Sequence, residues 1–257
     1  MKRMKPILTN SELGRIAEEF WQELGPLKKF PRDIETAITM RLPAGILKLP
    51  QLTGSTVADW LRARRLLVTI PIERRPLMGC LVAYRGHGII FVCGADKRDE
   101  QRLTIAHEAA HLLHDYLVPR NRAINLFGPS ITEVLDGFRP ATPSERVEAV
   151  LEGVPIGAHV HLLPRTDFGW DSEPAVLASE SGADGLAMEL IAPALCRRAL
   201  ITKLVAQKKS MEAVCKALAI HFGVPAVAFR ELVAPRFKKN RPGFLEDALL
   251  TLRTGRL

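Results

Sequence analysis

The chain has 257 residues and a formal net charge of +8, with 47% hydrophobic and 25% charged residues. This composition is typical of a globular protein large enough to bury a core, and no apolar run reaches the length of a membrane span. The basic start is followed by neither the apolar stretch nor the cleavage site of a signal peptide, so we expect a cytoplasmic protein without membrane contact. The cysteines lack paired CxxC spacing, which argues against a structural zinc site built from them and favours reduced thiols; they are Cys80, Cys93, Cys196 and Cys215.

The first 65 residues predict a helical segment. The sequence TNSE at residues 9–12 fits an N-terminal capping box, and an amphipathic helix follows to Leu24, before Gly25 and Pro26. The proline-flanked stretch at residues 42–54 is loop-like. A second short helix is expected over residues 55–66, with Ser55 or Thr56 at its N-cap.

Residues 66–94 predict a small antiparallel sheet. The segments 66–72, 77–84 and 89–94 are apolar and β-branched, and a turn at RGHG, residues 85–88, joins the last two. Residues 95–117 then switch to helical periodicity. The buried stripe of that helix is expected to consist of Leu103, Ala106, Ala110, Leu113 and Leu117.

The rest of the chain predicts an insertion followed by helices. Residues 118–171 are rich in Pro and Gly, and we expect one helix there, 142–153, capped by Thr142 and Glu145, and one strand, 158–164. A further helix is expected from residue 173 to Pro193. Residues 196–257 predict two helices joined by FGVP and a basic tail. The pattern indicates an α+β fold, with a central unit over 66–195 between helical segments at 1–65 and 196–257.

The pentapeptide HEAAH, residues 107–111, has the spacing of a metal site. In an α-helix, positions i and i+4 face the same way, so His107 and His111 can present two imidazoles to one ion. Glu108 beside them can hold a water and take its proton, which suits metal-assisted hydrolysis. The alternative is a half-exposed helix face that carries two histidines. The buried stripe of the same helix favours the metal site.

A catalytic zinc site usually has three protein ligands and one open position. The helix over residues 173–193 offers Glu180 as the third ligand, and Asp184, one turn later, as the acceptor for the second ring N–H of a ligand histidine. The alternative is that both carboxylates are solvated. Glu173, which precedes a proline, and Glu189, which is out of phase with Asp184, are weaker candidates.

The segments RLTIAHEAAHLL and ESGADGLAMELIAP together resemble the ImmA/IrrE-type metallo-endopeptidases. In that family, an R-F-x-x-A-H-E-x-x-H helix precedes E-x-x-A-N-x-F-A-x-x-L-L-M-P. The matching positions of the second motif are Glu180, Ala183, Asp184, Leu186, Ala187, Leu190, Ile191 and Pro193. The resemblance spans residues 66–233 and implies a zincin-like core, zinc held by His107, His111 and Glu180, and Glu108 as general base. It also implies a helix-turn-helix repressor as the substrate.

Three features depart from that family. Ala110 stands where many members have Gly. Asp184 replaces the usual Asn and produces the E-x-x-x-D spacing of thermolysin-like gluzincins. The two motifs are 69 residues apart, from His111 to Glu180, so the insertion at 118–171 is expected to form a flap or part of the substrate groove.

Other polar side chains are weaker candidates. His159 and His161 share one face of the expected strand, because strand side chains alternate. They are candidates for a second metal site, and His161 is the better candidate to stabilise a transition-state oxyanion; a structural or surface role is the alternative. His114 is expected at the surface, with support of a ligand histidine as the alternative. Tyr116 is expected to pack or to cap.

The charge of +8 permits nucleic-acid binding without establishing it. The basic residues are dispersed, with small clusters at residues 62–65 and 236–241, and we expect them to be solvated. The C-terminal helix pair resembles a helix-turn-helix with Gly223 at the turn. Its second helix starts with PAVAF rather than with polar residues that read bases, so packing or protein docking is expected.

The leading interpretation is a zinc-dependent, regulatory endopeptidase that cleaves a specific protein partner; Mn²⁺ is an alternative ion. The alternative function is a catalytically inactive DNA- or protein-binding regulator that retains the fold, and a third is a toxin-like hydrolase. A binding protein would tolerate the loss of Glu108 but respond to the loss of the basic clusters, and its DNA affinity would fall steeply with salt.

Overall fold

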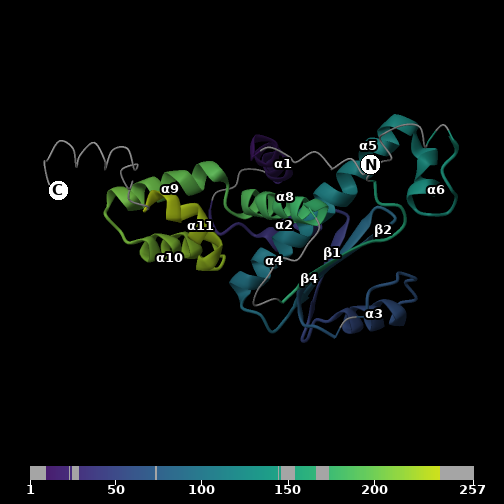
Figure 1. The fold of residues 1–257 in the computed structure, drawn as a ribbon, viewed down its shortest axis with the longest axis horizontal. Coiled ribbons are helices and arrows are strands. Elements are labelled where there is room, and N and C mark those ends of the chain that lie inside the picture. Colours follow the sequence, from purple (N-terminus) through teal and green to yellow (C-terminus); the bar gives the residue numbers. More distant parts are fainter. Residues whose placement is uncertain are drawn as a thin grey trace, which may run out of the picture.

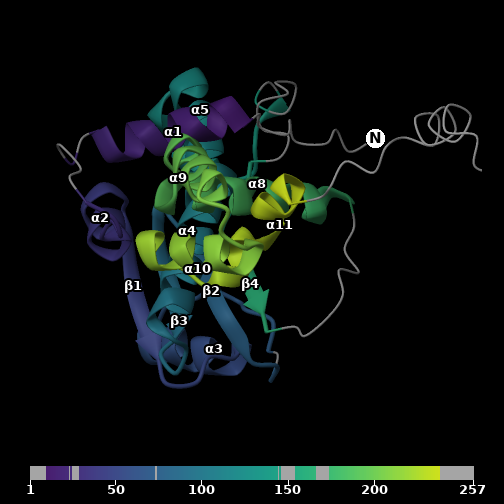
Figure 2. The same cartoon turned by 90° about the vertical axis from the view of Figure 1, so that its left-hand side faces the viewer.

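A mixed β-sheet covered by helices on both faces organises the computed structural model (Figures 1 and 2). The structure describes residues 10–22, 24, 29–72, 74–143, 145, 154–165 and 174–237, without the side chains of residues 10 and 174–181. The α+β class expected from the sequence is confirmed.

Within these residues, the strands are β1 (Ala44–Leu49), β2 (Leu77–Tyr84), β3 (His87–Cys93) and β4 (His159–Pro164). The longer helices are α1 (Asn10–Gln22), α2 (Ile34–Arg41), α3 (Gly54–Ala63), α4 (Arg98–His111), α5 (Val118–Phe127), α8 (Pro174–Ile191), α9 (Ala194–Ala206) and α10 (Met211–Phe222). Shorter elements are the π-helical turn η1 (Leu112–Leu117), the 3₁₀ turns η2 (Pro129–Ile131), η4 (Ala226–Phe229) and η5 (Ala234–Arg236), and the short helices α6 (Thr132–Leu135) and α11 (Arg230–Val233).

The sheet has the order β1-β3-β2-β4, with β1 parallel to β3 and the other pairs antiparallel. The hairpin of β2 and β3 and the strand β4 are confirmed. The loop expected at residues 42–54 is wrong, because β1 forms there. The strand expected at residues 66–72 is also wrong: this segment is irregular, and Leu67 is 99% exposed. The sheet is therefore mixed rather than wholly antiparallel.

Side-chain alternation divides the core between the two faces of the sheet. Leu81 and Ala83 of β2 and Ile90 and Val92 of β3 pack in the larger core, together with α1, α4 and α8. The intervening side chains of the same strands pack in a smaller core under α3; they are Cys80, Val82, Phe91 and Cys93. The helix α3 spans Gly54–Ala63 rather than residues 55–66, and Thr53 rather than Ser55 or Thr56 is its N-cap, in a capping box with Thr56.

The larger core joins the N-terminal, central and C-terminal segments. Trp21 of α1 donates its indole N–H to the Leu190 carbonyl of α8, at 2.9 Å. In the C-terminal segment, Arg102 of α4 donates to the Phe222 and Gly223 carbonyls at the end of α10. A cation is favourable at that position, since the last carbonyls of a helix lack partners and carry partial negative charge. The helix that carries HEAAH is thus tied to the C-terminal helices.

The insertion differs from the expected irregular segment. The helix α4 continues through η1 into α5, with Pro119 in the first turn of α5, where a missing N–H costs little.

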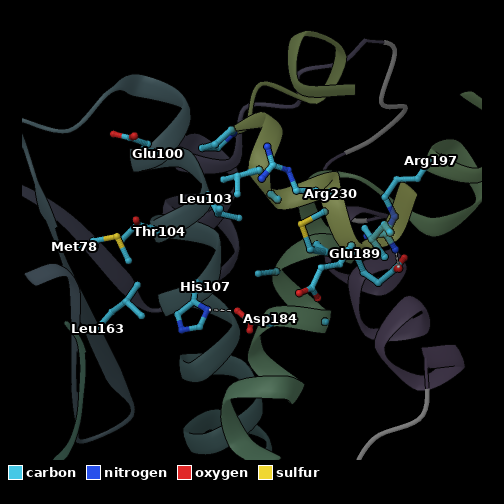
Figure 3. Close-up of a pocket in the computed structure, with 18 of the residues that line it drawn as sticks. Met78, Glu100, Leu103, Thr104, His107, Leu163, Asp184, Glu189, Arg197 and Arg230 are labelled. Carbon is cyan, nitrogen blue, oxygen red and sulfur yellow. Dashed lines mark hydrogen bonds and ion pairs between the residues drawn. The ribbon is translucent and has the colours of Figure 1, made fainter. Parts of the chain in front are cut away.

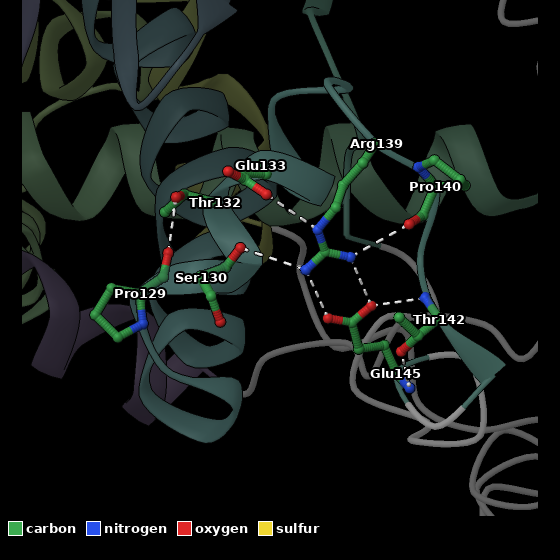
Figure 4. Close-up of polar contacts among 8 residues, drawn as sticks. All are labelled: Pro129, Ser130, Thr132, Glu133, Arg139, Pro140, Thr142 and Glu145. Carbon is green, nitrogen blue, oxygen red and sulfur yellow. Dashed lines mark hydrogen bonds and ion pairs between the residues drawn. The ribbon is translucent and has the colours of Figure 1, made fainter.

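Beyond α5, Arg139 donates to both carboxylate oxygens of Glu145 and to the Ser130 and Pro140 carbonyls (Figure 4). The hydrogen bonds from Arg139 to the Glu145 carboxylate, together with the bond from the Thr142 N–H, lower the pKa of Glu145 to about 2. The expected Thr142 and Glu145 capping box is present; the rest of the 142–153 helix lies outside the described residues.

The C-terminal pair is not a helix-turn-helix with a long second helix. Ser210 caps α10, and Gly223 ends it in the left-handed conformation, with φ of 68°. The chain then bends by 115° into η4 and α11. Among the described residues, no single helix is long and apolar enough to cross a membrane; only α10 and the bent segment Ala226–Arg236 counted together reach that length and composition.

Candidate metal centre

His107 and His111 face each other across one turn of α4. Their Nε2 atoms are 3.1 Å apart, and the His107 and His111 side chains are almost fully buried. Two nitrogen ligands of a tetrahedral zinc ion lie about 3.3 Å apart, given zinc–nitrogen bonds of about 2.0–2.1 Å. The structure therefore brings this pair together at nearly the separation that one metal ion requires.

Carboxylates hold the opposite nitrogens of both rings. His107 Nδ1 lies 3.0 Å from Asp184 Oδ1, and His111 Nδ1 lies 2.6 Å from Asp115 Oδ2. A carboxylate oxygen accepts a hydrogen bond from a nitrogen that carries a proton. We therefore assign to both rings the neutral tautomer with the proton on Nδ1. Each Nε2 then carries a lone pair, and the two lone pairs converge. A cation between them relieves the repulsion, which is the arrangement that carboxylate–histidine–metal triads use.

Asp184 lies where the sequence analysis places it, against His107, although its side chain is 60% exposed. Glu180 lies in the same helix, one turn earlier. Its side chain is outside the described residues, as is Glu173, and its role as third ligand stays a prediction. Gly182 lies beside the His114 ring while Asp184 lies beside His107, so α8 runs antiparallel to α4. The backbone of Glu180, one turn before Asp184, therefore lies toward the His111 end of the site.

Glu189 has a different role. Its carboxylate accepts the backbone N–H of Ala194 at 3.0 Å and the guanidinium of Arg197 at 2.6 Å. The Glu189 side chain therefore caps the start of α9 and pairs with a cation. Both oxygens have partners, so its carboxylate is not turned toward the histidines.

Glu108 is fully buried beneath the histidine pair. Its Oε2 accepts a hydrogen bond from His161 Nδ1 at 2.9 Å, while Oε1 has no hydrogen-bond partner within the described part of the chain. A buried carboxylate oxygen without a partner is costly, and such groups concentrate at functional sites. Gly79 of β2 provides the space for this carboxylate, since a Cβ there would lie 2.6 Å from Oε1.

His161 reaches the site because of strand alternation. It pairs with Leu81 in the β2–β4 register and therefore points to the α4 face of the sheet. Its ring stacks on that of His111, with centroids 3.8 Å apart. One ligand atom from each of His107, His111 and His161 lies within 4.8 Å of the other two. The residue singled out from the strand pattern is thus at the site, as a candidate ligand as well as a partner of Glu108.

Asp115 is the functional residue that the sequence analysis missed. It is 2% exposed, and its two oxygens accept from His111 Nδ1 and His114 Nδ1, at 2.6 and 2.9 Å. His114, expected at the surface, is largely buried and supports His111 through this carboxylate. Asp115 follows His111 by four residues, a spacing that could have indicated the contact. It lies in the π-helical turn η1, and π-helical turns often occur at functional sites.

Two further side chains serve the fold. Tyr116 is buried, and its hydroxyl accepts the Gly86 N–H of the β2–β3 turn at 2.9 Å, as expected of a packing or capping residue. Burial raises the pKa of that Tyr116 hydroxyl. Burial also raises the pKa of the Cys80 thiol far above its usual range, and the charge of Glu108 adds to the shift. Cys80 is therefore a protonated core residue.

An open cleft of about 1210 Å³ begins at the histidines. Figure 3 shows His107 and Asp184 between the sheet side, with Met78 and Leu163, and the helices that carry Glu189, Arg197 and Arg230. The volume exceeds that of an ordinary small-molecule pocket, which is about 300–1,000 Å³. The site therefore opens into a cleft that is larger than such a pocket.

No protein-family model matches this chain, and a search of curated proteins found no similar sequence.

We predict that Gly79→Ala destabilises the fold through the Glu108 pocket. The new methyl group would contact Glu108 Oε1 and Thr104 Cγ2, both at 2.6 Å. Overpacking of this kind costs about 1–3 kcal/mol in the free energy of unfolding, measured by urea denaturation. Gly45→Ala on β1 is the matched control, because its Cβ meets no atom within 4 Å. Equal stability of the two variants would contradict this account of Gly79.

We predict that Asp115→Asn weakens binding of Zn²⁺ by about 10–100-fold, because the amide holds His111 less firmly and lacks the carboxylate charge. Competition with a chromophoric chelator measures the affinity. Asp59→Asn, an exposed residue of α3, is the control. Unchanged affinity in Asp115→Asn would remove Asp115 from the metal centre.

Proposed function

We propose that the chain is a zinc-dependent endopeptidase of the ImmA/IrrE type, which acts in the cytoplasm on a specific protein partner such as a helix-turn-helix repressor. The observation that carries the proposal is the convergent pair of Nε2 atoms, 3.1 Å apart, with both Nδ1 atoms bonded to carboxylates. The resemblance of the two sequence motifs to that family is the second support.

The donor set fits zinc. Imidazole nitrogens and a carboxylate are common zinc ligands, and three protein ligands leave a coordination position open for chemistry. His107 and His111 would supply two ligands, and Glu180 remains our choice for the third, since it would complete the His2Glu set of the family. His161 is the alternative third ligand, because it lies in the same cluster of imidazoles.

Bound zinc would polarise the scissile carbonyl and lower the pKa of a coordinated water. Glu108 acts as general base: it takes a proton from the attacking water and passes it to the leaving amine. His161 donates its Nδ1–H to Glu108 Oε2, which orients the carboxylate and leaves Oε1 as the second acceptor. The burial of Glu108 and His111 strengthens their hydrogen bonds, because the surrounding dielectric is low.

The dimensions of the cleft favour a polypeptide substrate. Its lining runs from β4 and α4 to α8, α9 and α11, so it borders more of the chain than one small ligand would contact. A regulatory protease also needs extended recognition, because discrimination between similar peptide bonds requires contacts away from the bond that is cleaved.

We predict that Glu108→Gln retains zinc and loses cleavage by at least about 100-fold, because an amide cannot take the proton. Fragments of casein and of co-purified helix-turn-helix repressors, identified by mass spectrometry, measure the activity, and elemental analysis measures the zinc. Glu212→Gln, an exposed residue at the start of α10, is the control for the same chemical change. Full activity in the zinc-loaded Glu108→Gln protein would exclude Glu108 as the base.

A further inference from the structure

The far wall of the cleft comes from the C-terminal segment. The elements α9, η4, α11 and η5 contribute more than a third of its lining, although they lie far from HEAAH in the sequence. Three exposed arginines of this wall border the cleft: Arg198, Arg230 and Arg236. In Figure 3, Arg230 projects from α11 over the cleft on the side that faces Leu103.

Charge is distributed unevenly along the cleft. At the histidines, Asp184 bonds to His107; farther along the cleft, Glu100 lies at the start of α4 and Asp96 is neutralised by Arg165. At the far wall, Glu189 neutralises Arg197, and one acidic side chain, Glu231, accompanies the three arginines in the described lining. The far wall thus has an excess of positive charge.

Apolar side chains lie among the arginines. Val227 and Leu232 line the cleft and are 68% and 45% exposed. Ile201 of α9 and Pro225 line it as well. Exposed aliphatic groups beside guanidinium groups form a surface that complements an amphipathic polypeptide with acidic side chains. Nucleic acid would use the charge but leave the aliphatic groups without apolar partners, since its bases would have to unstack to reach them.

The wall is held in place relative to the metal centre. Glu189, one turn beyond Gly185 on the helix that carries Asp184, caps α9 and binds Arg197. Arg102, on the helix that carries His107, binds the end of α10. A Cβ at Gly223 would lie 2.8 Å from Pro31, so the α10 end is also closely packed. The helices that carry the arginines are therefore held at a fixed position relative to the histidines, which reduces the cost of ordering the backbone on binding.

We propose that this wall, formed by α9, η4, α11 and η5, binds an acidic amphipathic segment of the polypeptide substrate and so selects which protein is cleaved. The inference rests on the proposed endopeptidase function. Arg198, Arg230 and Arg236 pair with substrate carboxylates, and Val227 and Leu232 contact its apolar face.

The test measures binding apart from cleavage. A fluorescent 20-residue peptide of alternating Glu and Leu blocks is titrated with the full-length Glu108→Gln protein, and fluorescence anisotropy reports the affinity. Arg198→Glu and Arg230→Glu should each weaken binding by about 10-fold or more, because a repulsive charge replaces an attractive one. Arg62→Glu, an exposed arginine on α3, should leave the affinity unchanged. A peptide with Lys in place of Glu should bind at least about 10-fold more weakly.

Three outcomes would overturn the proposal: equal affinity in Arg198→Glu and Arg230→Glu, equal binding of the Lys peptide, or tighter binding of a single-stranded oligonucleotide that the same arginines support. Arg198→Ala and Arg230→Ala, whose folding is checked by circular dichroism, guard against a structural effect of the charge reversal. Because binding is measured without turnover, a failure of the docking surface is distinguishable from a failure of zinc catalysis.

Discussion

The burial of His107, Glu108 and His111 inside α4 is the constraint on which the rest of the structure depends. Buried polar groups are unfavourable unless each atom has a partner, and this helix is covered on nearly all sides. Asp184, Asp115 and His161 supply those partners from α8, η1 and β4. Within the described residues, Glu108 Oε1 has no hydrogen-bond partner, and the two Nε2 atoms lie 3.1 Å apart. The proposed function places a metal ion at these nitrogens and a water at Oε1.

Two glycines of the sheet leave room for side chains of α4 and η1. Gly79 removes a side chain where Glu108 lies, at the irregular register between Leu77 and Gly79, and Gly88 does the same opposite Leu112. Irregularities and glycines in strands often mark a site where another group approaches closely. The same face of the sheet carries His161, so one layer provides both the space for the carboxylate and its hydrogen-bond donor. The C-terminal helices α9 and α11 form the opposite wall of the cleft that begins at this site.

The parts of the site that follow a regular period could be predicted from the sequence. Helical spacing placed His107 beside His111, and strand alternation placed His161 on the right face. The strand β1 was missed because its short apolar run is flanked by prolines, and a parallel partner far along the chain, β3, stabilises it. Residues 66–72 resemble a strand in composition, yet they have no ladder partner, and only Ile70 is buried. Asp115 was missed because it is an acidic residue in an apparently amphipathic helix, and only the fold shows that its side of η1 is buried.

The metal content of the purified protein tests the central claim most directly. Wild type and Glu180→Gln are exposed to zinc, freed of unbound metal and analysed by elemental mass spectrometry, with circular dichroism as the check on folding. We expect about one zinc per wild-type chain and clearly less in Glu180→Gln. Equal zinc in both would keep the metal centre and transfer the third-ligand role to His161. A folded wild-type protein that binds no zinc would contradict the account, because the convergent histidines would then have no ion to hold.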